Sequence, residues 1–317
     1  MVLKRLKVWS HRTLRSMLFA LLTISFVVCV LQFVRFGTSN HHEQARRIGS
    51  YREHSVVPVT NIPNCDAGFH ICLWRSILNS SKALPSSLNR FEVAVTEAEY
   101  NISIDLLRIF AETMEKNNLT YFMYGGTLIG SIRHHGLIPW DDDIDVIARH
   151  ADRGKIWQIF REMEPKYTIH QPSNHKFLKL FSNHSRRTTH DYGWKWPFLD
   201  IWLYDDLGDN IKDWSCPWCK SKFPKHLIFP LLKRPFAHLS LYSPLDPTGF
   251  LEIDYRWRRC AARTWSHRNE DIWKRTIQDV PCSYLTPYYP FVEVKDDGGN
   301  LTELLMFNNS ILSYFRL

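Results

Sequence analysis

The stretch that decides the fold occupies residues 121–146 and reads Tyr-Phe-Met-Tyr-Gly-Gly-Thr-Leu-Ile-Gly-Ser-Ile-Arg-His-His-Gly-Leu-Ile-Pro-Trp-Asp-Asp-Asp-Ile-Asp-Val. Its aromatic and apolar beginning, together with the two residues before it (residues 119–124), predicts a buried strand that stops at the pair Gly125-Gly126. The residues after this pair fit a short helix. The closing acidic run alternates with apolar residues, as a half-buried strand does. The stretch therefore predicts a strand, a helix and a second strand in close succession.

Before this stretch, apolar residues recur at three- and four-residue steps and predict an amphipathic helix that ends near Asn117-Asn118. They are Ile102, Leu106, Ile109, Phe110, Thr113 and Met114. After it, residues 151–164 fit a helix, and residues 177–181 and 198–204 fit strands. This succession predicts an α/β or α+β fold with a mixed sheet and flanking helices. No order of elements is predicted beyond Asp213.

The acidic run predicts a metal site. Side chains two residues apart share one face of a strand, so Asp141, Asp143 and Asp145 are expected to point one way, and Ile144 and Val146 into the core. Neighbouring carboxylates repel one another unless a cation neutralises them, and Mg²⁺ or Mn²⁺ prefers oxygen ligands. We therefore predict that a divalent cation binds at this run.

Two further acids need separate interpretations. Asp200 lies in the otherwise apolar strand predicted at residues 198–204, where an unpaired carboxylate would be costly, so it is predicted to be a third ligand. The alternative for Asp200 is an ion pair with a nearby lysine or arginine. Asp142 is out of phase with its neighbours and is expected to be solvated or to cap a turn.

The glycine pair predicts a phosphate site. Gly125 and Gly126, between a strand and a helix, allow a phosphate to approach backbone N–H groups at the helix N-terminus, beside Thr127. Arg133 is a candidate partner for the same phosphate, whereas the two histidines after it are expected to be loop residues rather than ligands. Carboxylates that bind a metal and a glycine turn that faces phosphates together predict metal-assisted phosphoryl or nucleotidyl transfer.

At these residues the sequence resembles the LicD family, which includes bacterial phosphocholine transferases, fukutin and fukutin-related protein. The resemblance covers residues 102–205, about a third of the chain. It rests on Gly-Gly-Thr-Leu-x-Gly, the following Arg-His, and Ile-Pro-Trp-Asp-x-Asp-x-Asp. The resemblance implies a nucleotidyltransferase fold related to the polymerase-β superfamily.

The resemblance also implies an activity: transfer of a phospho-alcohol, of the phosphocholine or ribitol phosphate type, from a CDP-linked donor to a glycan of glycoproteins or glycolipids. In such folds paired carboxylates bind Mg²⁺, which carries over to Asp143 and Asp145, with Asp141 adjacent and Asp200 as the third carboxylate. The expected catalytic residues are Asp143, Asp145 and Asp200; the metal ligands are these three and Asp141; and the donor-binding residues are Gly125, Gly126, Thr127 and Arg133.

The N-terminal segment predicts the topology. The formal net charge is +8, but residues 1–35 hold six Lys/Arg and no acid, so the rest of the chain carries only +2 and does not resemble a nucleic-acid-binding body. Residues 16–34 hold no charge and are long enough as a helix to cross about 30 Å of hydrocarbon. The basic residues before them place the N-terminus in the cytosol. A cleaved signal peptide is the alternative to an anchor.

These features predict four regions: a cytoplasmic tail at 1–15, a transmembrane signal-anchor at 16–34, a polar stem at 35–89 and a luminal catalytic domain at 90–317. Six Asn-x-Ser/Thr sequons follow the anchor, at Asn79, Asn101, Asn118, Asn183, Asn300 and Asn308. They indicate passage through a glycosylating compartment. By its resemblance to the animal LicD members, the chain is expected to be a single-pass type II protein of the Golgi membrane.

Six cysteines follow the anchor: Cys65, Cys72, Cys216, Cys219, Cys260 and Cys282. An oxidising lumen favours disulfides, with a zinc site as the alternative.

The basic and aromatic segment 255–265 is expected to be a solvated helix face, with contact to an anionic ligand or the membrane surface as the alternative. Two other functions stay open: a metal-dependent glycosyltransferase that uses a nucleotide sugar, and a catalytically inactive Golgi adaptor of the same fold.

Overall fold

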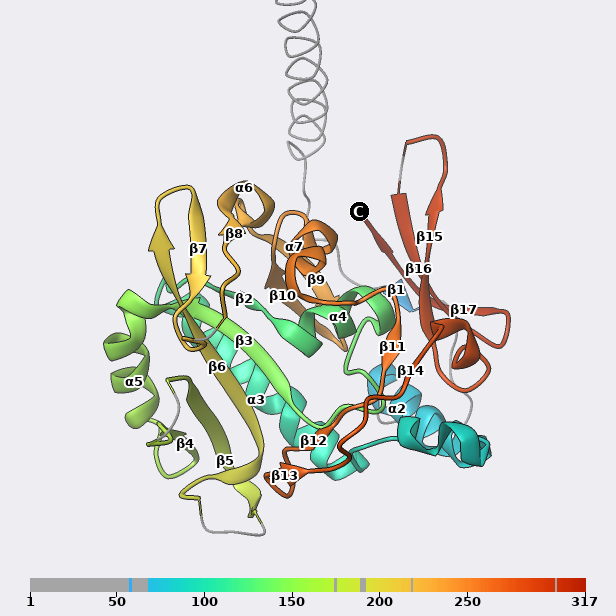
Figure 1. The fold of residues 1–317 in the computed structure, drawn as a ribbon, viewed down its shortest axis with the longest axis horizontal. Helices are drawn as coiled ribbons and strands as arrows, with labels where there is room; N and C mark the ends of the chain where they lie inside the picture. The colour runs from blue at the N-terminus through green and yellow to red at the C-terminus, as the bar shows by residue number, and fades with distance from the viewer. Residues whose placement is uncertain (1–56, 59–67, 174–175, 189–191, 218, 300) are drawn as a thin grey trace, which may run out of the picture. The chain divides into compact units, whose positions relative to one another are not determined.

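The computed structural model describes residues 57–58, 68–173, 176–188, 192–217, 219–299 and 301–317 (Figure 1). They belong to the unit His54–Leu317. Among these described residues, no helix combines the length and the apolar character needed to cross a membrane. The predicted tail at 1–15 and the predicted span at 16–34 lie outside them, so both stay predictions.

A mixed sheet forms the centre of the domain. Its strands follow the order β2-β3-β6-β5-β4, and β7 pairs with β6 and with β8 (Figure 1). β3 and β6 run parallel, and the other pairs of this sheet are antiparallel. The bounds are β2 Tyr121–Met123, β3 Ile144–Arg149, β4 Tyr167–His170, β5 Leu178–Arg187, β6 Lys195–Leu207, β7 Asn210–Asp213 and β8 Phe223–Pro224. The predicted mixed α/β architecture is confirmed.

Helices flank this sheet where the apolar periodicity predicted them. α3 (Glu97–Lys116) begins at a capping box, in which Thr96 and Glu99 bond each other's backbone N–H groups, and its cap at the other end is Asn117. Behind the sheet in the view of Figure 1, α3 packs against β5 and β6. α4 (Gly125–His134) follows β2 directly, and α5 (Arg153–Arg161) packs on β4. The three predicted helices are therefore present.

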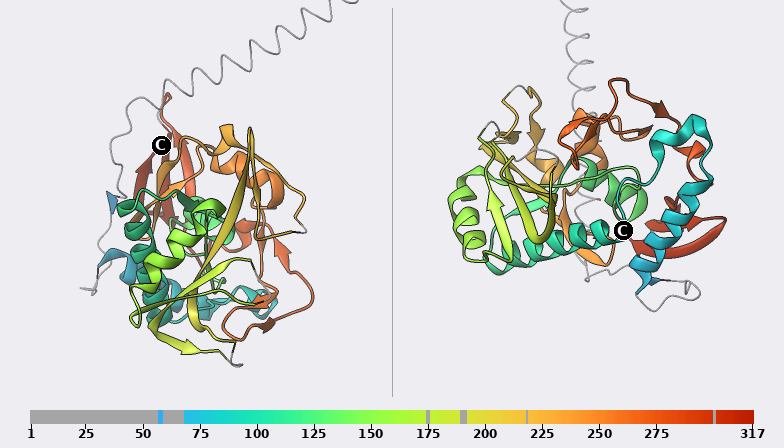
Figure 2. Two further views of the ribbon diagram at one scale, coloured as in Figure 1. Left: turned by 90° about the vertical axis from the view of Figure 1, so that its left-hand side faces the viewer. Right: turned by 90° about the horizontal axis from the view of Figure 1, so that it is seen from below.

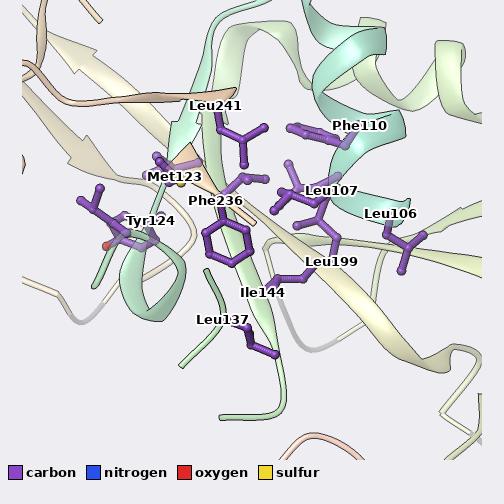
Figure 3. Close-up of a cluster of buried hydrophobic side chains, with 14 of the residues drawn as sticks. Leu106, Leu107, Phe110, Met123, Tyr124, Leu137, Ile144, Leu199, Phe236 and Leu241 are labelled. Carbon is purple, nitrogen blue, oxygen red and sulfur yellow. The ribbon is translucent and has the colours of Figure 1, made fainter. Parts of the chain in front are cut away.

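The core lies between α3, the sheet and the hairpin of β9 (Leu232–Phe236) and β10 (Leu239–Ser243). Figure 3 shows side chains from these elements meeting, among them Phe110, Phe236 and Leu241. Ile144 and Leu199 are cross-strand partners in the parallel pair β3–β6, and both are fully buried. Burying this apolar surface stabilises the domain and fixes the two strands that carry the acidic residues.

The segment before residue 90, which the sequence analysis assigned to the stem, contributes to this core. α2 (Phe69–Ser80) buries Trp74 and Ile77, and Trp74 stacks on Tyr100 of α3 with ring centroids 4.2 Å apart. The folded region therefore includes α2, ahead of the predicted start. Residues 69–80 are themselves largely apolar and hold no proline, but the polar segments on either side of them led to the stem assignment.

The chain after Asp213, where no order was predicted, forms short elements and a second sheet. α6 (Lys225–Ile228) and α7 (Pro247–Asp254) precede two small ladders, of β11 (Cys260–Ala261) with β14 (Asp279–Val280) and of β12 (Trp265–Ser266) with β13 (Asp271–Ile272). The second sheet has the order β1-β17-β16-β15 and lies on the same side of the domain as α2 (Figure 2). Its bounds are β1 Val57–Pro58, β15 Phe291–Asp296, β16 Leu301–Phe307 and β17 Ser310–Arg316.

Candidate active site

Three charged residues form a row across the central sheet. In the strand register, Asp145 of β3 lies opposite Asp200 of β6, and Asp200 lies opposite Lys179 of β5. Paired residues on neighbouring strands project from the same face of the sheet, so the hydrogen-bond ladder alone brings these three side chains together. The predicted proximity of Asp145 and Asp200 thus follows from the parallel pairing of β3 with β6.

Asp143 completes a set of three carboxylates, here called the carboxylate triad (Asp143, Asp145 and Asp200). Each offers an oxygen, and these oxygens all lie within 4.8 Å of one another. Oxygen-only donors at this spacing are the chemistry that Mg²⁺ and Mn²⁺ prefer. The donor set therefore fits the divalent cation that the sequence predicted.

Asp141 lies beside this triad but outside it. β3 begins only at Ile144, so Asp141 and Asp143 do not occupy the regular strand that was predicted for them. Asp141 instead approaches the start of α4, where its Oδ2 would lie 2.8 Å from a Cβ placed on Gly126. It hydrogen-bonds Asp143 through its side chain. The triad therefore contains two of the three acidic-run residues predicted as ligands.

The two glycines are needed because carboxylates lie against the helix start. Gly125 has φ +50°, and a Cβ there would lie 3.2 Å from Asp145 Oδ2. At Gly126 the same role is played by Asp141, as described above. Since a helix N-terminus attracts negative charge, this contact favours the ionised carboxylates. The glycines at the predicted phosphate-binding turn thus admit side-chain oxygens of this chain.

Burial and mutual repulsion perturb the site. Burial, followed by the charge of Asp200, raises the pKa of Asp145 to about 7, although Trp202 Nε1 donates to its Oδ1 at 2.8 Å. Burial also raises the pKa of Asp143 well above its usual range, and its acidic neighbours add to this effect. For Asp141, burial and then Asp142 raise the pKa. For all three carboxyl groups burial is the largest cause of the raised pKa, and neighbouring acids add to it.

Asp142 corrects a prediction. It was expected to be solvated or to cap a turn, yet its side chain is 0% exposed. One oxygen lies 2.6 Å from Arg263 Nη1, and the other lies 3.0 Å from His267 Nδ1. Although burial opposes ionisation, these partners hold the pKa of Asp142 below its usual value. The prediction assumed that side chains alternate along a strand at this position. Asp142 instead precedes β3 and faces a segment more than a hundred residues later in the chain.

His267 is a site residue that sequence reasoning missed. Its Nε2 lies 3.2 Å from Asp143 Oδ2 while its Nδ1 faces Asp142, so the ring bridges two carboxylates. Burial lowers the pKa of His267, but the charge of Asp143 and the hydrogen bond to Asp142 outweigh this effect and raise it to about 10. The ring is therefore a cation at neutral pH. Nothing in the local sequence around residue 267 distinguishes it from a surface histidine.

Lys179 forms an ion pair with Asp200, as the alternative interpretation of Asp200 predicted. Its Nζ lies 2.9 Å and 3.1 Å from the two carboxylate oxygens of Asp200 and 3.7 Å from Glu270 Oε1. Lys179 is itself buried, above the ring of Phe198 with 3.3 Å to the centroid. Asp200 thus belongs both to an ion pair and to the carboxylate triad. The prediction of Asp200 as a third ligand and its alternative are both compatible with this geometry.

Two residues predicted to bind the donor have partners within the chain. Thr127 is buried, and its hydroxyl accepts a hydrogen bond of 2.7 Å from the backbone N–H of Asp145, so it fixes the start of β3. Arg133 donates to the backbone carbonyls of Trp257 and Arg259, and burial lowers its pKa to about 10. Because α4 ends at His134, Arg133 lies at the opposite end of the helix from the glycines.

The two histidines after Arg133 are buried rather than exposed in a loop. His134 Nδ1 lies 2.7 Å from the Pro290 carbonyl oxygen, and His135 Nε2 lies 3.0 Å from Glu303 Oε2. They join the end of α4 to the C-terminal sheet and its preceding loop. Among the residues that the structure describes, the groups that could bind a metal do not include either histidine.

The cysteines follow the disulfide prediction where the structure describes them. Cys216 bonds Cys219, Cys260 bonds Cys282, and Cys72 is also disulfide-bonded. Cys65 lies outside the described residues. The segment 255–265, expected to be a helix face, instead lies outside any helix, because α7 ends at Asp254; it holds a turn at residues 257–258 and strand β11.

Residues 118–246 match the family model described as the LicD/FKTN/FKRP nucleotidyltransferase domain. This part of the chain is therefore similar to the LicD-type nucleotidyltransferase domain. Asp141, Asp143, Asp145, Lys179 and Asp200 all lie within the matched residues, whereas His267 lies beyond them.

Relatives with this domain include proteins of named activity. The lipopolysaccharide cholinephosphotransferase LicD of Haemophilus influenzae is 30% identical over 141 residues, which are 42% of this chain and 48% of that protein. The human ribitol 5-phosphate transferase FKRP is 26% identical over 167 residues, 47% of this chain and 30% of that protein. An uncharacterised protein of Rickettsia prowazekii is 29% identical over 163 residues, 49% of this chain and 55% of that protein. The chain thus spans about half the length, or less, of these relatives.

A solved structure with partial likeness is ANT(2")-Ia in complex with adenylyl-2"-tobramycin. It shares 13% sequence identity with a TM-score of 0.32, over 44% of this chain and 68% of that chain.

Proposed function

We propose that this protein is a metal-dependent transferase that moves a phospho-alcohol from a CDP-linked donor onto a glycan. The observation that carries the proposal is the carboxylate triad, whose oxygens lie within 4.8 Å of one another inside the part of the chain that is similar to the LicD-type domain. The named relatives transfer cholinephosphate or ribitol 5-phosphate, which supports this substrate class. The alcohol and the acceptor glycan of this chain are left to experiment.

In this proposal the chain's own residues bind and orient the reactants. Asp143, Asp145 and Asp200 would hold Mg²⁺ or Mn²⁺, and the cation would supply Lewis-acid neutralisation of phosphate charge. Thr127 fixes the backbone of Asp145, and Trp202 fixes its side chain. The N-terminus of α4 adjoins the triad, so its backbone N–H groups are placed to face the donor's diphosphate.

We also propose the Golgi lumen as the site of action, with residues 16–34 as the anchor. The five sequon asparagines that the structure describes (Asn79, Asn101, Asn118, Asn183 and Asn308) are all exposed, as glycosylation requires. Disulfides such as Cys260–Cys282 persist in oxidising compartments, which supports the same placement.

One observation favours a second candidate, an inactive adaptor of the same fold. Lys179 is hydrogen-bonded to both oxygens of Asp200, so a resident cation already neutralises one member of the triad. If Lys179 kept Asp200 from binding a metal, the domain would retain its fold without turnover. A nucleotide-sugar glycosyltransferase is the third candidate, because a pair of aspartates with a metal also serves that chemistry.

One experiment separates the three candidates. The purified protein is incubated with a panel of CDP-alcohols and nucleotide sugars in Mg²⁺ or Mn²⁺, and release of CMP or of a nucleoside diphosphate is measured. We expect CMP release from a CDP-alcohol, lost on addition of EDTA. The variant Asp143→Ala/Asp145→Ala should lose at least about 10³-fold in rate while it keeps the circular dichroism spectrum of the wild type. Full activity of this variant would refute the assignment.

A control variant tests whether the loss is local. His150→Ala removes a partner of Asp205 on the surface, where the two side chains are 2.8 Å apart. It should keep wild-type turnover. Release of nucleoside diphosphate from sugar donors alone would favour the glycosyltransferase, and absence of any metal binding would favour the adaptor.

A further inference from the structure

We propose that His267 is a positioning residue that holds the Asp143 carboxylate in the orientation that a divalent cation needs. The inference rests on the proposed metal site at the triad and adds a residue from outside the matched domain. It is carried by the contacts of one ring: His267 Nδ1 lies 3.0 Å from Asp142, and Nε2 lies 3.2 Å from Asp143.

Asp142 fixes the ring that in turn fixes Asp143. The Asp142 side chain is fully buried and also contacts Arg263 Nη1 at 2.6 Å. The backbone carbonyl of the same residue accepts a hydrogen bond of 2.8 Å from Trp196 Nε1. With both its carboxylate and its backbone held, Asp142 is a rigid acceptor for His267 Nδ1. The other ring nitrogen therefore meets Asp143 Oδ2 in one defined direction, as partners behind a metal ligand do.

The same three residues could in principle bind a second metal, because Asp142, Asp143 and His267 each offer a donor atom within 4.8 Å of the others. The partners of Asp142 argue against this. Besides contacting His267, its carboxylate forms an ion pair with the Arg263 guanidinium and accepts a hydrogen bond of 3.4 Å from the backbone N–H of Arg268. A carboxylate with this set of donors is already neutralised and saturated, so the group forms a hydrogen-bond chain rather than a second metal site.

The segment that carries His267 is held in place at its base, as a positioning role requires. The disulfide Cys260–Cys282 closes a loop, here called the 260–282 loop, and β11 pairs with β14 just inside it. Trp140, one residue before the acidic run, donates from Nε1 to the carbonyl of Ala261 at 3.0 Å. A closed loop of this length loses less conformational entropy when it is ordered against the triad.

A second contact ties the 260–282 loop to the other half of the site. Glu270 lies 3.7 Å from Lys179, and its Oε1 accepts a hydrogen bond of 2.8 Å from Trp194. The loop thus touches both Asp143 and the lysine that pairs with Asp200. Since the family match ends at residue 246, the metal site is completed by a part of the chain beyond the matched domain.

Positioning and simple charge compensation predict opposite effects. If His267 only supplied positive charge, its removal would make the site more negative and would tighten cation binding. If His267 holds Asp143 in place, removal lets the Asp143 carboxylate turn away from the triad, and binding weakens. The sign of the change in affinity therefore decides between the two.

The test measures Mn²⁺ binding by electron paramagnetic resonance on the full chain, so it does not depend on knowing the substrate. We expect His267→Ala to weaken Mn²⁺ binding by about 10-fold or more, the range found for partners behind a metal ligand. His267→Arg, which can donate to both carboxylates, should recover most of the loss. Asp142→Asn should weaken binding in the same direction but less.

Controls keep the outcomes distinct. His150→Ala, a change at a histidine–aspartate pair outside the site, should leave Mn²⁺ affinity unchanged. Because alanine leaves Asp142 and Asp143 without a common partner, folding is checked by circular dichroism, and His267→Gln, which retains one N–H donor, provides a second reading. Tighter or unchanged binding in folded His267→Ala and His267→Gln would overturn the positioning role. Failure of the wild type to bind Mn²⁺ would instead overturn the metal site itself, and this inference with it.

Discussion

Two buried charged clusters in this domain differ in their balance of charge. The first is the carboxylate triad, which with Asp141 and Asp142 holds five acids near Lys179, His267 and Arg263. The second, here called the hairpin anchor, joins Glu303 of β16 to Arg234 of β9 and to His135 after α4. Both oxygens of Glu303 lie 2.8 Å from Arg234 Nη2, and all three residues are about 95% buried.

The pKa shifts of the two clusters differ in sign. In the hairpin anchor, burial opposes ionisation of Glu303, but Arg234 and His135 hold its pKa below the usual value. In the triad, burial and neighbouring acids raise the pKa of Asp145 to about 7. In the anchor, the charge of Arg234 therefore compensates that of Glu303, whereas in the triad the acids outnumber the cations that face them. A surplus of buried charge distinguishes a binding site from a structural ion pair.

The largest expected effect is a loss of stability when the ion pair of the hairpin anchor is removed. Arg234→Met should lower the free energy of unfolding by about 3–5 kcal/mol, because Glu303 would stay buried without its main partner. Urea unfolding followed by tryptophan fluorescence measures the change. The matched control is Arg108→Met on α3, whose exposed pairs with Asp105 and Glu112 should contribute about 0.5 kcal/mol. Equal losses in the two variants would mean that the anchor is not a stabilising cluster.

In the carboxylate triad, by contrast, we expect the loss of one charge to increase the stability of the fold. Asp145→Asn should raise the stability of the metal-free protein by about 1–2 kcal/mol at pH 8, since it removes a charge whose ionisation the native state opposes. The amide oxygen can still accept the hydrogen bond from Trp202. The same variant should lose the rise in melting temperature that Mn²⁺ gives the wild type. A destabilised Asp145→Asn protein would contradict the view that the triad carries surplus charge.

The smallest expected effect is the dependence of stability on pH, which should differ between the triad and the hairpin anchor. A carboxyl group with a raised pKa stabilises the fold most below its ordinary value of 3.8, and Asp145 loses this contribution as the pH rises through about 7. His267, raised from 6.5 to about 10, loses its contribution as the pH rises through about 10. The metal-free protein should therefore become less stable from pH 5 to pH 8, while Mn²⁺ binds more tightly over the same range.

The anchor predicts the reverse trend at low pH. Glu303, with a lowered pKa, stabilises the fold above its ordinary value of 4.5, and this contribution is lost as the pH falls further. Melting temperatures measured with and without Mn²⁺ between pH 3.5 and 8.5 report both the loss of stability at low pH and the decline between pH 5 and 8. In Asp145→Asn the decline between pH 5 and 8 should become shallower. If the melting temperature of this variant falls as steeply as that of the wild type between pH 5 and 8, a group other than Asp145 controls the decline.

Much of the site could be predicted from short-range pattern. The alternation of residues 141–146 predicted a strand with its carboxylates on the face opposite the core, and the apolar surroundings of Asp200 predicted a second strand. The structure pairs these two strands in parallel, with Asp145 opposite Asp200. The glycine pair predicted a helix start, which the structure confirms at Gly125. These predictions succeeded because strand and helix periodicity act over a few residues.

Other parts of the site depend on contacts that no local pattern reports. Asp142 was predicted to be solvated, but it pairs with Arg263 and His267, which lie more than a hundred residues later. Lys179 reads in the sequence as an ordinary charged residue, and it became a partner of Asp200 only through the antiparallel pairing of β5 with β6. Segment 255–265 suggested a helix by composition, yet in the fold it consists of a turn and short strands.

By itself, the sequence determined the order of the central elements, the apolar core and the presence of an acidic site in a LicD-type domain, because these depend on composition and on periods of two and 3.6 residues. Only the tertiary structure decided which cations face which carboxylates: Lys179 at Asp200, His267 at Asp143 and Arg234 at Glu303. The reason is physical: the strength of an ionic contact depends on separation and burial in space, which spacing along the chain does not fix.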